Sequence, residues 1–231
     1  MDRAEETSIV LSGDWTTPET SRLQTAWFKA LAIEQKLSEH VRYMHGMSGK
    51  KYRYLINNLI ESTPDARYLE VGSWRGSTAC SAMYGNKCKV TCIDNWAEFG
   101  GPRDEFFQNI EQAKSPDVDF NAIEQDFRTV DYNNIGKYNV YMFDGPHLEE
   151  DQYDGVKIAQ PALDDTYTLI VDDWSGKHIQ VGTKNALRDL GHEIVAQMEI
   201  ITRHDDAHPK IAHENSDWHC GYFIAVVKKP Q

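Results

Sequence analysis

The chain has 231 residues, of which 40% are hydrophobic and 11% aromatic, and this apolar content is too high for a disordered protein. Its formal net charge of −12 argues against a nucleic-acid partner, because proteins that clamp a nucleic-acid backbone present a basic stripe. The N-terminus lacks the basic and apolar regions of a signal peptide. The longest apolar run, Tyr222 to Val227, is too short to span a membrane.

The cysteines show no C-x-x-C motif, and three of them lie close together in an apolar context. This pattern predicts free buried thiols in a reducing cytoplasm rather than a disulfide or a zinc site. The residues concerned are Cys80, Cys88, Cys92 and Cys220.

The first third of the chain is expected to be helical after a loose, acidic start over residues 1–17. A helical pattern begins at Pro18, where a first-turn proline is tolerated, and its apolar residues repeat with a period near 3.6 as far as Val41. The segment 44–49 interrupts it. Ser48 is expected to cap a second helix that ends near Ser62.

After residue 66 the pattern changes to strand, turn and helix. Strands are predicted over 68–71, 89–93, 120–124, 138–143 and 168–171, with later strands near 194–202 and 222–227. Helices are predicted over 77–84, 104–113, 149–162 and 183–190. Apolar strands that alternate with helices predict a parallel sheet covered on both faces. Right-handed crossovers make this a doubly wound α/β fold.

Acidic residues follow every predicted parallel strand. In an open α/β sheet, ligands bind outside the carboxyl ends of the strands. A single acid at such a place is a common turn former, but acids after five strands in register predict a site. They are Glu70, Asp94, Asp126, Asp144 and the pair Asp172-Asp173.

The glycine loop after the first strand reads G-x-x-x-G-S, from Gly72 to Ser77. Ser73 or Trp74 stands where the dinucleotide motif needs a glycine beside the pyrophosphate, which disfavours an NAD-binding dehydrogenase. Glu70 would repel phosphates but suits a positive ligand. Asp94 lies at about the usual spacing for an acid that binds ribose hydroxyls. A ribose, a cationic group and no phosphate together describe S-adenosylmethionine.

The run from Leu69 to Ser77 resembles motif I of the class I S-adenosylmethionine-dependent methyltransferases. It is most similar to the magnesium-dependent macrolide-sugar and catechol-type O-methyltransferases, as are the segments 143–147, 169–174 and 182–187. The resemblance covers roughly residues 45–200. It implies a Rossmann-like, mostly parallel sheet with an antiparallel last strand. It also implies an N-terminal helical cap over residues 1–62 and a cofactor-binding domain over residues 63–231.

The resemblance also implies roles for the residues at the strand ends. Glu70, Gly72 and Gly76 would lie along the methionine part of the cofactor, Asp94 would bind the ribose, and Asp126 would bind the adenine amino group. Trp96 would cover the adenine or serve as an ordinary core aromatic. The other residues predicted to bind the cofactor are Ser73, Trp74, Ser77, Asn95, Gln125 and Asp144.

Asp144, Asp172 and Asp173 are predicted to hold a divalent cation. Neighbouring strands lie about 4.8 Å apart, so carboxylates at their ends would converge, repel one another and raise each other's pKa. Magnesium would remove that repulsion, because it prefers oxygen ligands. The resemblance implies the same ligands. The alternative is that Asp172 and Asp173 form a turn or a helix N-cap.

His147 follows Asp144 by three residues, at the spacing where catechol-type relatives have a catalytic lysine. Histidine suits a general base at neutral pH, so His147 and Asp144 are the predicted catalytic residues; His147 alternatively supports the loop or contacts the substrate. The segment 204–219 holds four of the nine histidines. It is expected to be a solvated substrate loop rather than a second metal site.

The expected activity is transfer of a methyl group from S-adenosylmethionine to a hydroxyl of a small acceptor, expected to be a sugar, with help from magnesium. Neither a nucleic-acid nor a membrane partner is expected, and assembly into a homo-oligomer is left open. The alternatives are a metal-independent methyltransferase that uses His147 as its base and a non-catalytic relative that only binds.

Overall fold

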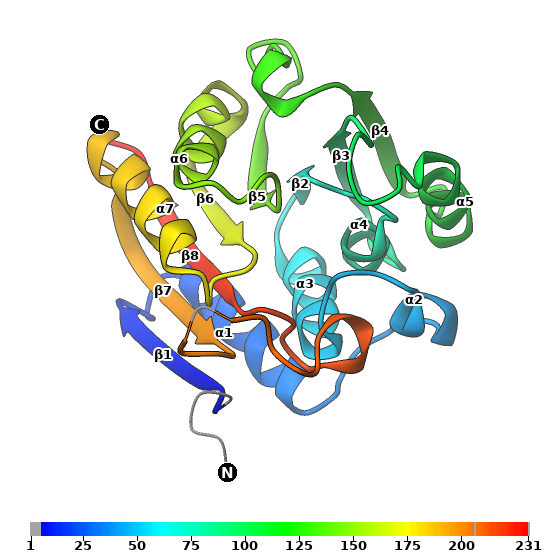
Figure 1. Cartoon of the computed structure of the whole chain (residues 1–231), viewed down its shortest axis with the longest axis horizontal. Coiled ribbons are helices and arrows are strands. Elements are labelled where there is room, and N and C mark those ends of the chain that lie inside the picture. Colours follow the sequence, from blue (N-terminus) through cyan, green and yellow to red (C-terminus); the bar gives the residue numbers. More distant parts are fainter. Residues whose placement is uncertain (1–5, 206, 231) are drawn as a thin grey trace.

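The computed structural model describes residues 6–205 and 207–230, which contain one eight-stranded sheet. The strand order is β1-β7-β8-β6-β5-β2-β3-β4 (Figure 1). The strands are β1 Ser8–Gly13, β2 Arg67–Val71, β3 Cys88–Asp94, β4 Val118–Glu124, β5 Tyr138–Phe143, β6 Leu163–Val171, β7 Glu193–Ile201 and β8 Tyr222–Lys228. The five neighbouring strands β6, β5, β2, β3 and β4 run parallel, and β8 is antiparallel to both β6 and β7. The predicted Rossmann-like sheet with an antiparallel last strand is confirmed.

Helices cover both faces of this sheet. They are α1 Pro18–Leu31, α2 Glu39–Tyr43, α3 Lys50–Ser62, α4 Ser77–Met83, α5 Arg103–Ala113, α6 Glu149–Ile158 and α7 Lys177–Asp189. The first five contribute to one hydrophobic core, and α6 and α7 contribute to the other. Figure 1 shows α7 in front of β7 and β8 and α1 behind them.

The central strand β5 shows why the sheet is buried on both sides. Val140 and Met142 pack into the core with the first five helices, whereas Tyr141 and Phe143 pack into the core with α6 and α7. Successive side chains of a strand point to opposite faces. A strand covered on both faces therefore reads as a continuous apolar run, as parallel strands do.

The loose start expected over residues 1–17 is wrong where the chain forms β1. This strand pairs antiparallel with β7, from Ser8 opposite Ile201 to Gly13 opposite Ala196. Its side chains are mostly exposed, so the alternation of buried and polar residues that reveals a half-buried strand is absent.

The first helix is shorter than its apolar period predicts. It ends at Leu31, and Ile33 adopts a left-handed φ of 60°. Val41 belongs to the separate helix α2. The predicted cap at Ser48 is also wrong, because Gly49 is the N-cap of α3 and the Ser48 hydroxyl accepts from Arg53 Nε at 2.9 Å instead.

Among the described residues, no helix has the length and apolarity needed to cross a bilayer. The four cysteines are free and buried, as predicted. The helices before residue 63 share a core with residues of the sheet. The domain boundary between residues 62 and 63 stays a prediction.

Candidate active site

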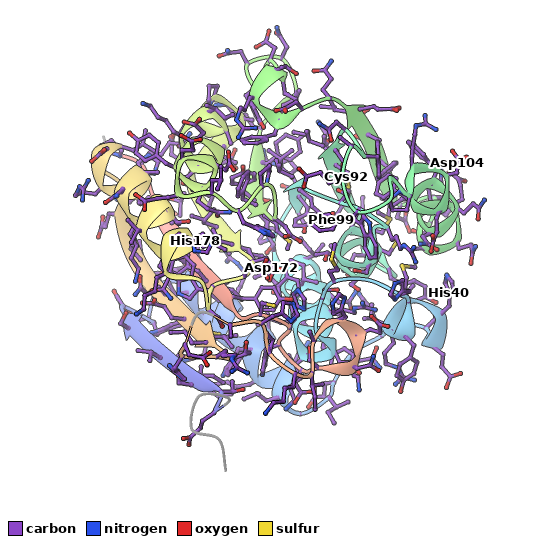
Figure 2. All side chains as sticks on the ribbon, viewed as in Figure 1. His40, Cys92, Phe99, Asp104, Asp172 and His178 are labelled. Atoms are coloured by element: carbon purple, nitrogen blue, oxygen red, sulfur yellow. The ribbon has the colours of Figure 1, made fainter. Side chains whose placement is uncertain are left out.

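A cavity of about 850 Å³ opens at the carboxyl ends of the parallel strands. Most of the predicted site residues line it: Gly72, Trp74, Asp94, Asn95, Trp96, Gln125, Asp126, Asp144, His147 and Asp173. Its size is that of a small-molecule site. Figure 2 shows Asp172 near the middle of the molecule, with Phe99 on the side of α5 and His178 on the side of α7.

The remaining predicted residues lie outside the cavity wall, namely Glu70, Ser73, Gly76, Ser77 and Asp172. Glu70 is fully buried at the end of β2, where the Tyr68 hydroxyl donates to Glu70 Oε2 at 2.6 Å. Burial raises the pKa of Glu70 to about 7. A direct contact between Glu70 and a cofactor stays a prediction.

The two glycines of the loop are required by the protein's own packing. Gly72 has a φ of +84°, and a Cβ there would lie 1.8 Å from the carbonyl oxygen of Asp144. Gly76 has a φ of +81°, and a Cβ there would lie 2.9 Å from the Phe106 ring. Both positions need a conformation that L side chains rarely adopt. The loop after β2 can therefore lie against the end of β5.

Asp94, at the end of β3, holds this loop in place. Its Oδ2 accepts the backbone N–H groups of Ser73 and Trp74, both at 2.8 Å, and its Oδ1 accepts that of Trp96 at 2.7 Å. A carboxylate has about four lone-pair sites, so few are left for a ligand in this arrangement. The structure thus adds a loop-ordering role to the ribose contact predicted for Asp94.

Two tryptophans of the cavity wall, Trp74 and Trp96, are linked by a hydrogen bond. Trp96 Nε1 donates to the carbonyl oxygen of Trp74 at 2.9 Å, and its ring centroid lies 5.0 Å from that of Phe106. Trp74 Nε1 donates to the carbonyl oxygen of Phe99 at 3.0 Å. Trp96 is only 8% exposed yet lines the cavity. It is a core aromatic with one surface toward the site.

Asp126 caps a short helical turn at the other side of the cavity. Its Oδ1 accepts the backbone N–H of Arg128 at 2.9 Å, and the Arg128 guanidinium lies 3.6 Å from the same oxygen. Arg128 also pairs with Asp151. The predicted contact of Gln125 and Asp126 with an adenine stays a prediction.

Two of the three predicted metal ligands are acids with strongly shifted pKa values: Asp172 is buried and Asp144 is half-buried. Burial, followed by the neighbouring carboxylates, raises the pKa of both well above the usual range. Asp172 Oδ1 also accepts the backbone N–H of Asp173 at 2.8 Å. The carboxylates of Asp172, Asp173 and Glu70 all raise the pKa of Asp144. Clustered oxygen donors of this kind fit a hard divalent cation.

Asp173 lies between two histidines. Its Oδ2 is 3.1 Å from His147 Nε2, and its Oδ1 is 3.6 Å from His219 Nε2. His219 is 5% exposed and lines the cavity. The solvated loop expected over residues 204–219 is therefore wrong at His219, which is carried into the wall by the turn before β8. Nothing in the spacing of the histidines indicated this contact.

Asp173, His219 and Cys220 bring three potential metal-binding atoms within 4.8 Å of one another. The backbone N–H of His213, however, donates to His219 Nδ1 at 2.9 Å, and burial lowers the pKa of His219 to about 4, so the ring is neutral. A neutral imidazole with an accepting Nδ1 carries its proton on Nε2. His219 Nε2, 3.6 Å from Asp173 Oδ1 and beyond hydrogen-bond distance, therefore carries the proton and has no lone pair for a metal ion.

Comparison with known proteins agrees with this geometry. Residues 69–174 match the family model described as a methyltransferase domain. A search of curated protein sequences finds no significant match.

Solved structures share the fold at low identity. The O-methyltransferase from Bacillus cereus in complex with SAH has a TM-score of 0.55 and 14% identity, over 90% of this chain and 91% of that one. The SAH-bound Podospora anserina methyltransferase PaMTH1 has a TM-score of 0.56 and 11% identity, over 91% and 88%. TrmN from Thermus thermophilus has a TM-score of 0.51 and 13% identity over 77% of this chain, which spans only 49% of that protein. The fold is that of these methyltransferases.

Proposed function

We propose that this protein is an S-adenosylmethionine-dependent O-methyltransferase that acts on a hydroxyl of a small acceptor, of which a sugar is the first to test, with a divalent cation at Asp144, Asp172 and Asp173. The observation that carries the proposal is one cavity with Asp94 and the ordered glycine loop on one side and His147 with Asp173 on the other. The matched methyltransferase domain and the SAH-bound structural neighbours support it.

The walls of the cavity suit a cationic cofactor without phosphates. Asp94, Asp126 and Asp144 line it, and Gly72 is needed for packing against Asp144 rather than for a phosphate to approach. When bound, S-adenosylmethionine supplies an electrophilic methyl group. The protein's task is then to hold the acceptor oxygen in line with that methyl, and such positioning is worth about 7–11 kcal/mol of the barrier.

The acids at the strand ends support the divalent cation. Burial and neighbouring carboxylates raise the pKa of both Asp144 and Asp172, and a bound cation would remove that repulsion. Asp173 follows Asp172 in sequence and lines the cavity. A bound magnesium ion would supply the positive charge that favours loss of the acceptor's proton. His147, at 3.1 Å from Asp173, would receive that proton.

A second candidate is a metal-independent methyltransferase, and the contact between His147 and Asp173 favours it. A carboxylate that accepts from one ring nitrogen orients a histidine and leaves its other nitrogen free to act as a base. In this mechanism Asp173 acts through His147. Asp172, which accepts the backbone N–H of Asp173, has no direct part.

The test begins with calorimetry of S-adenosylhomocysteine and NAD, since the proposal requires binding of the first and not of the second. Turnover with S-adenosylmethionine and a panel of sugars then identifies an accepted hydroxyl. Activity that is lost in chelator and restored by magnesium supports the metal, whereas full activity in chelator supports the second candidate. Absence of transfer to any acceptor, despite tight cofactor binding, would indicate a non-catalytic relative.

One variant separates the two mechanisms, a second tests the base that they share, and a third is the control. Asp172→Asn should lower turnover strongly if the cation is needed, and only slightly if His147 works with Asp173 alone. His147→Gln should lower turnover in both cases. Asp189→Asn, at the exposed end of α7, is the matched control and should change nothing.

A further inference from the structure

Strand β1 is an uncovered apolar edge of the sheet. It pairs with β7 on one side and lies at one end of the sheet that the described residues form. Figure 1 shows it at the outer edge beyond β7. Half of the N–H and C=O groups of such a strand point away from its one neighbour. Ile9, Val10 and Leu11 are 39%, 53% and 44% exposed. Because successive side chains point to opposite faces, both faces of β1 reach solvent.

The opposite edge of the sheet is protected in a way that β1 is not. Strand β4 carries Asp119 and Glu124, and charged side chains on an edge strand discourage pairing with another chain. Strand β1 contains no charged residue and no proline over Ser8–Gly13. Within residues 6–205 and 207–230, it is therefore the edge of the sheet with the weaker protection against a further strand.

The sequence of β1 is nearly symmetric about its centre, which points to the occupant. From Ser8 to Ser12 it reads Ser-Ile-Val-Leu-Ser. If a second copy lies antiparallel with Val10 opposite its own equivalent, Ile9 faces Leu11 and Ser8 faces Ser12. A two-fold axis places the same patch on both partners, and the near-symmetry of β1 then brings like side chains opposite each other.

We propose that β1 pairs with β1 of a second copy of this chain, about a two-fold axis at Val10, to form one continuous sheet across a homodimer. Pairing through one six-residue strand falls short of the roughly 1,200 Å² that stable interfaces bury, so the dimer should be reversible and concentration-dependent. In the paired arrangement Glu6 comes near Asp14 of the second copy. Together with the net charge of −12, this repulsion means that added salt should strengthen the association.

The first experiment is sedimentation equilibrium of the full-length protein over a range of concentrations. We expect the wild type to approach twice the monomer mass and Val10→Lys to remain monomeric. Val181→Lys, at an apolar residue of α7 that is 43% exposed, is the matched control and should dimerise like the wild type. A wild type that stays monomeric, or a Val10→Lys variant that still dimerises, would overturn the proposal.

The second experiment tests the register. All four native cysteines are buried, so a new surface cysteine reports alone. With the axis at Val10, the two copies of Val10→Cys have Cα atoms about 5 Å apart, within reach of a disulfide. The two copies of Ile9→Cys are offset by two residues and lie about 8 Å apart, beyond that reach. Mild oxidation should link Val10→Cys into a dimer and leave Ile9→Cys unlinked; equal linking of both would contradict this pairing.

Discussion

Glu70 should make the stability of the protein depend on pH. Its carboxyl group is fully buried at the end of β2 and accepts from the Tyr68 hydroxyl. Burial raises its pKa from 4.5 to about 7. Between these two values the folded protein keeps a proton that the unfolded chain has lost. The free energy of unfolding therefore falls as the pH rises through this range.

The size of the effect follows from that shift. A change of one pKa unit corresponds to about 1.4 kcal/mol, so the full displacement of Glu70 from 4.5 to about 7 is worth on the order of 3 kcal/mol. Most of this change in the free energy of unfolding should occur between pH 5 and pH 8. Glu70→Gln is nearly isosteric, keeps an oxygen for Tyr68 and cannot ionise, so its stability should lack this component.

The assay is urea unfolding of the wild type and Glu70→Gln at several pH values from 5 to 8. From pH 5 to pH 8, the free energy of unfolding of the variant should rise by roughly 2–3 kcal/mol relative to that of the wild type. Asp144 and Asp172 titrate in both proteins, and because Glu70 also raises the pKa of Asp144, the difference measures Glu70 together with its effect on Asp144. Glu193→Gln, at an exposed site on β7, should follow the wild type. If the free energies of unfolding of Glu70→Gln and the wild type change with pH in parallel, the claim that the buried carboxyl group holds its proton near neutral pH is refuted.

Three further predictions follow from the site. Asp94→Asn removes a charge that accepts three backbone N–H groups, and each such hydrogen bond is worth about 1.5–3 kcal/mol. Calorimetry should therefore show at least about tenfold weaker binding of S-adenosylhomocysteine. Unchanged affinity would contradict both roles given to Asp94. His219→Gln keeps a donor toward Asp173, whereas His219→Asn keeps only the acceptor for the backbone of His213. Turnover should be higher in His219→Gln, and the reverse order would show that the contact with Asp173 does not matter. Arg53 is fully buried and donates to four backbone carbonyls and to Ser48. In urea unfolding, Arg53→Met should lower the free energy of unfolding by about 3 kcal/mol or more. The control Arg188→Met, at an exposed residue, should lower it by less than about 0.5 kcal/mol.

The sequence by itself determined the parallel sheet and the edge where its site lies. The runs that form β2, β3, β5 and β6 are apolar because both faces of these strands are covered. An acid follows each of them at the edge where ligands bind. These features are local in the chain, so periodicity and strand-end chemistry could find them.

The tertiary structure decided the rest, because it depends on contacts between residues far apart in the chain. β1 is a strand only because β7 is beside it, and its exposed apolar residues show no alternation. Asp94, at the end of β3, accepts backbone N–H groups from the loop that follows the neighbouring strand β2, and His219 lies 3.6 Å from Asp173 because the turn before β8 lies at the cavity wall. Spacing along the chain carries no signal for such pairs, since packing across the sheet sets which side chains meet.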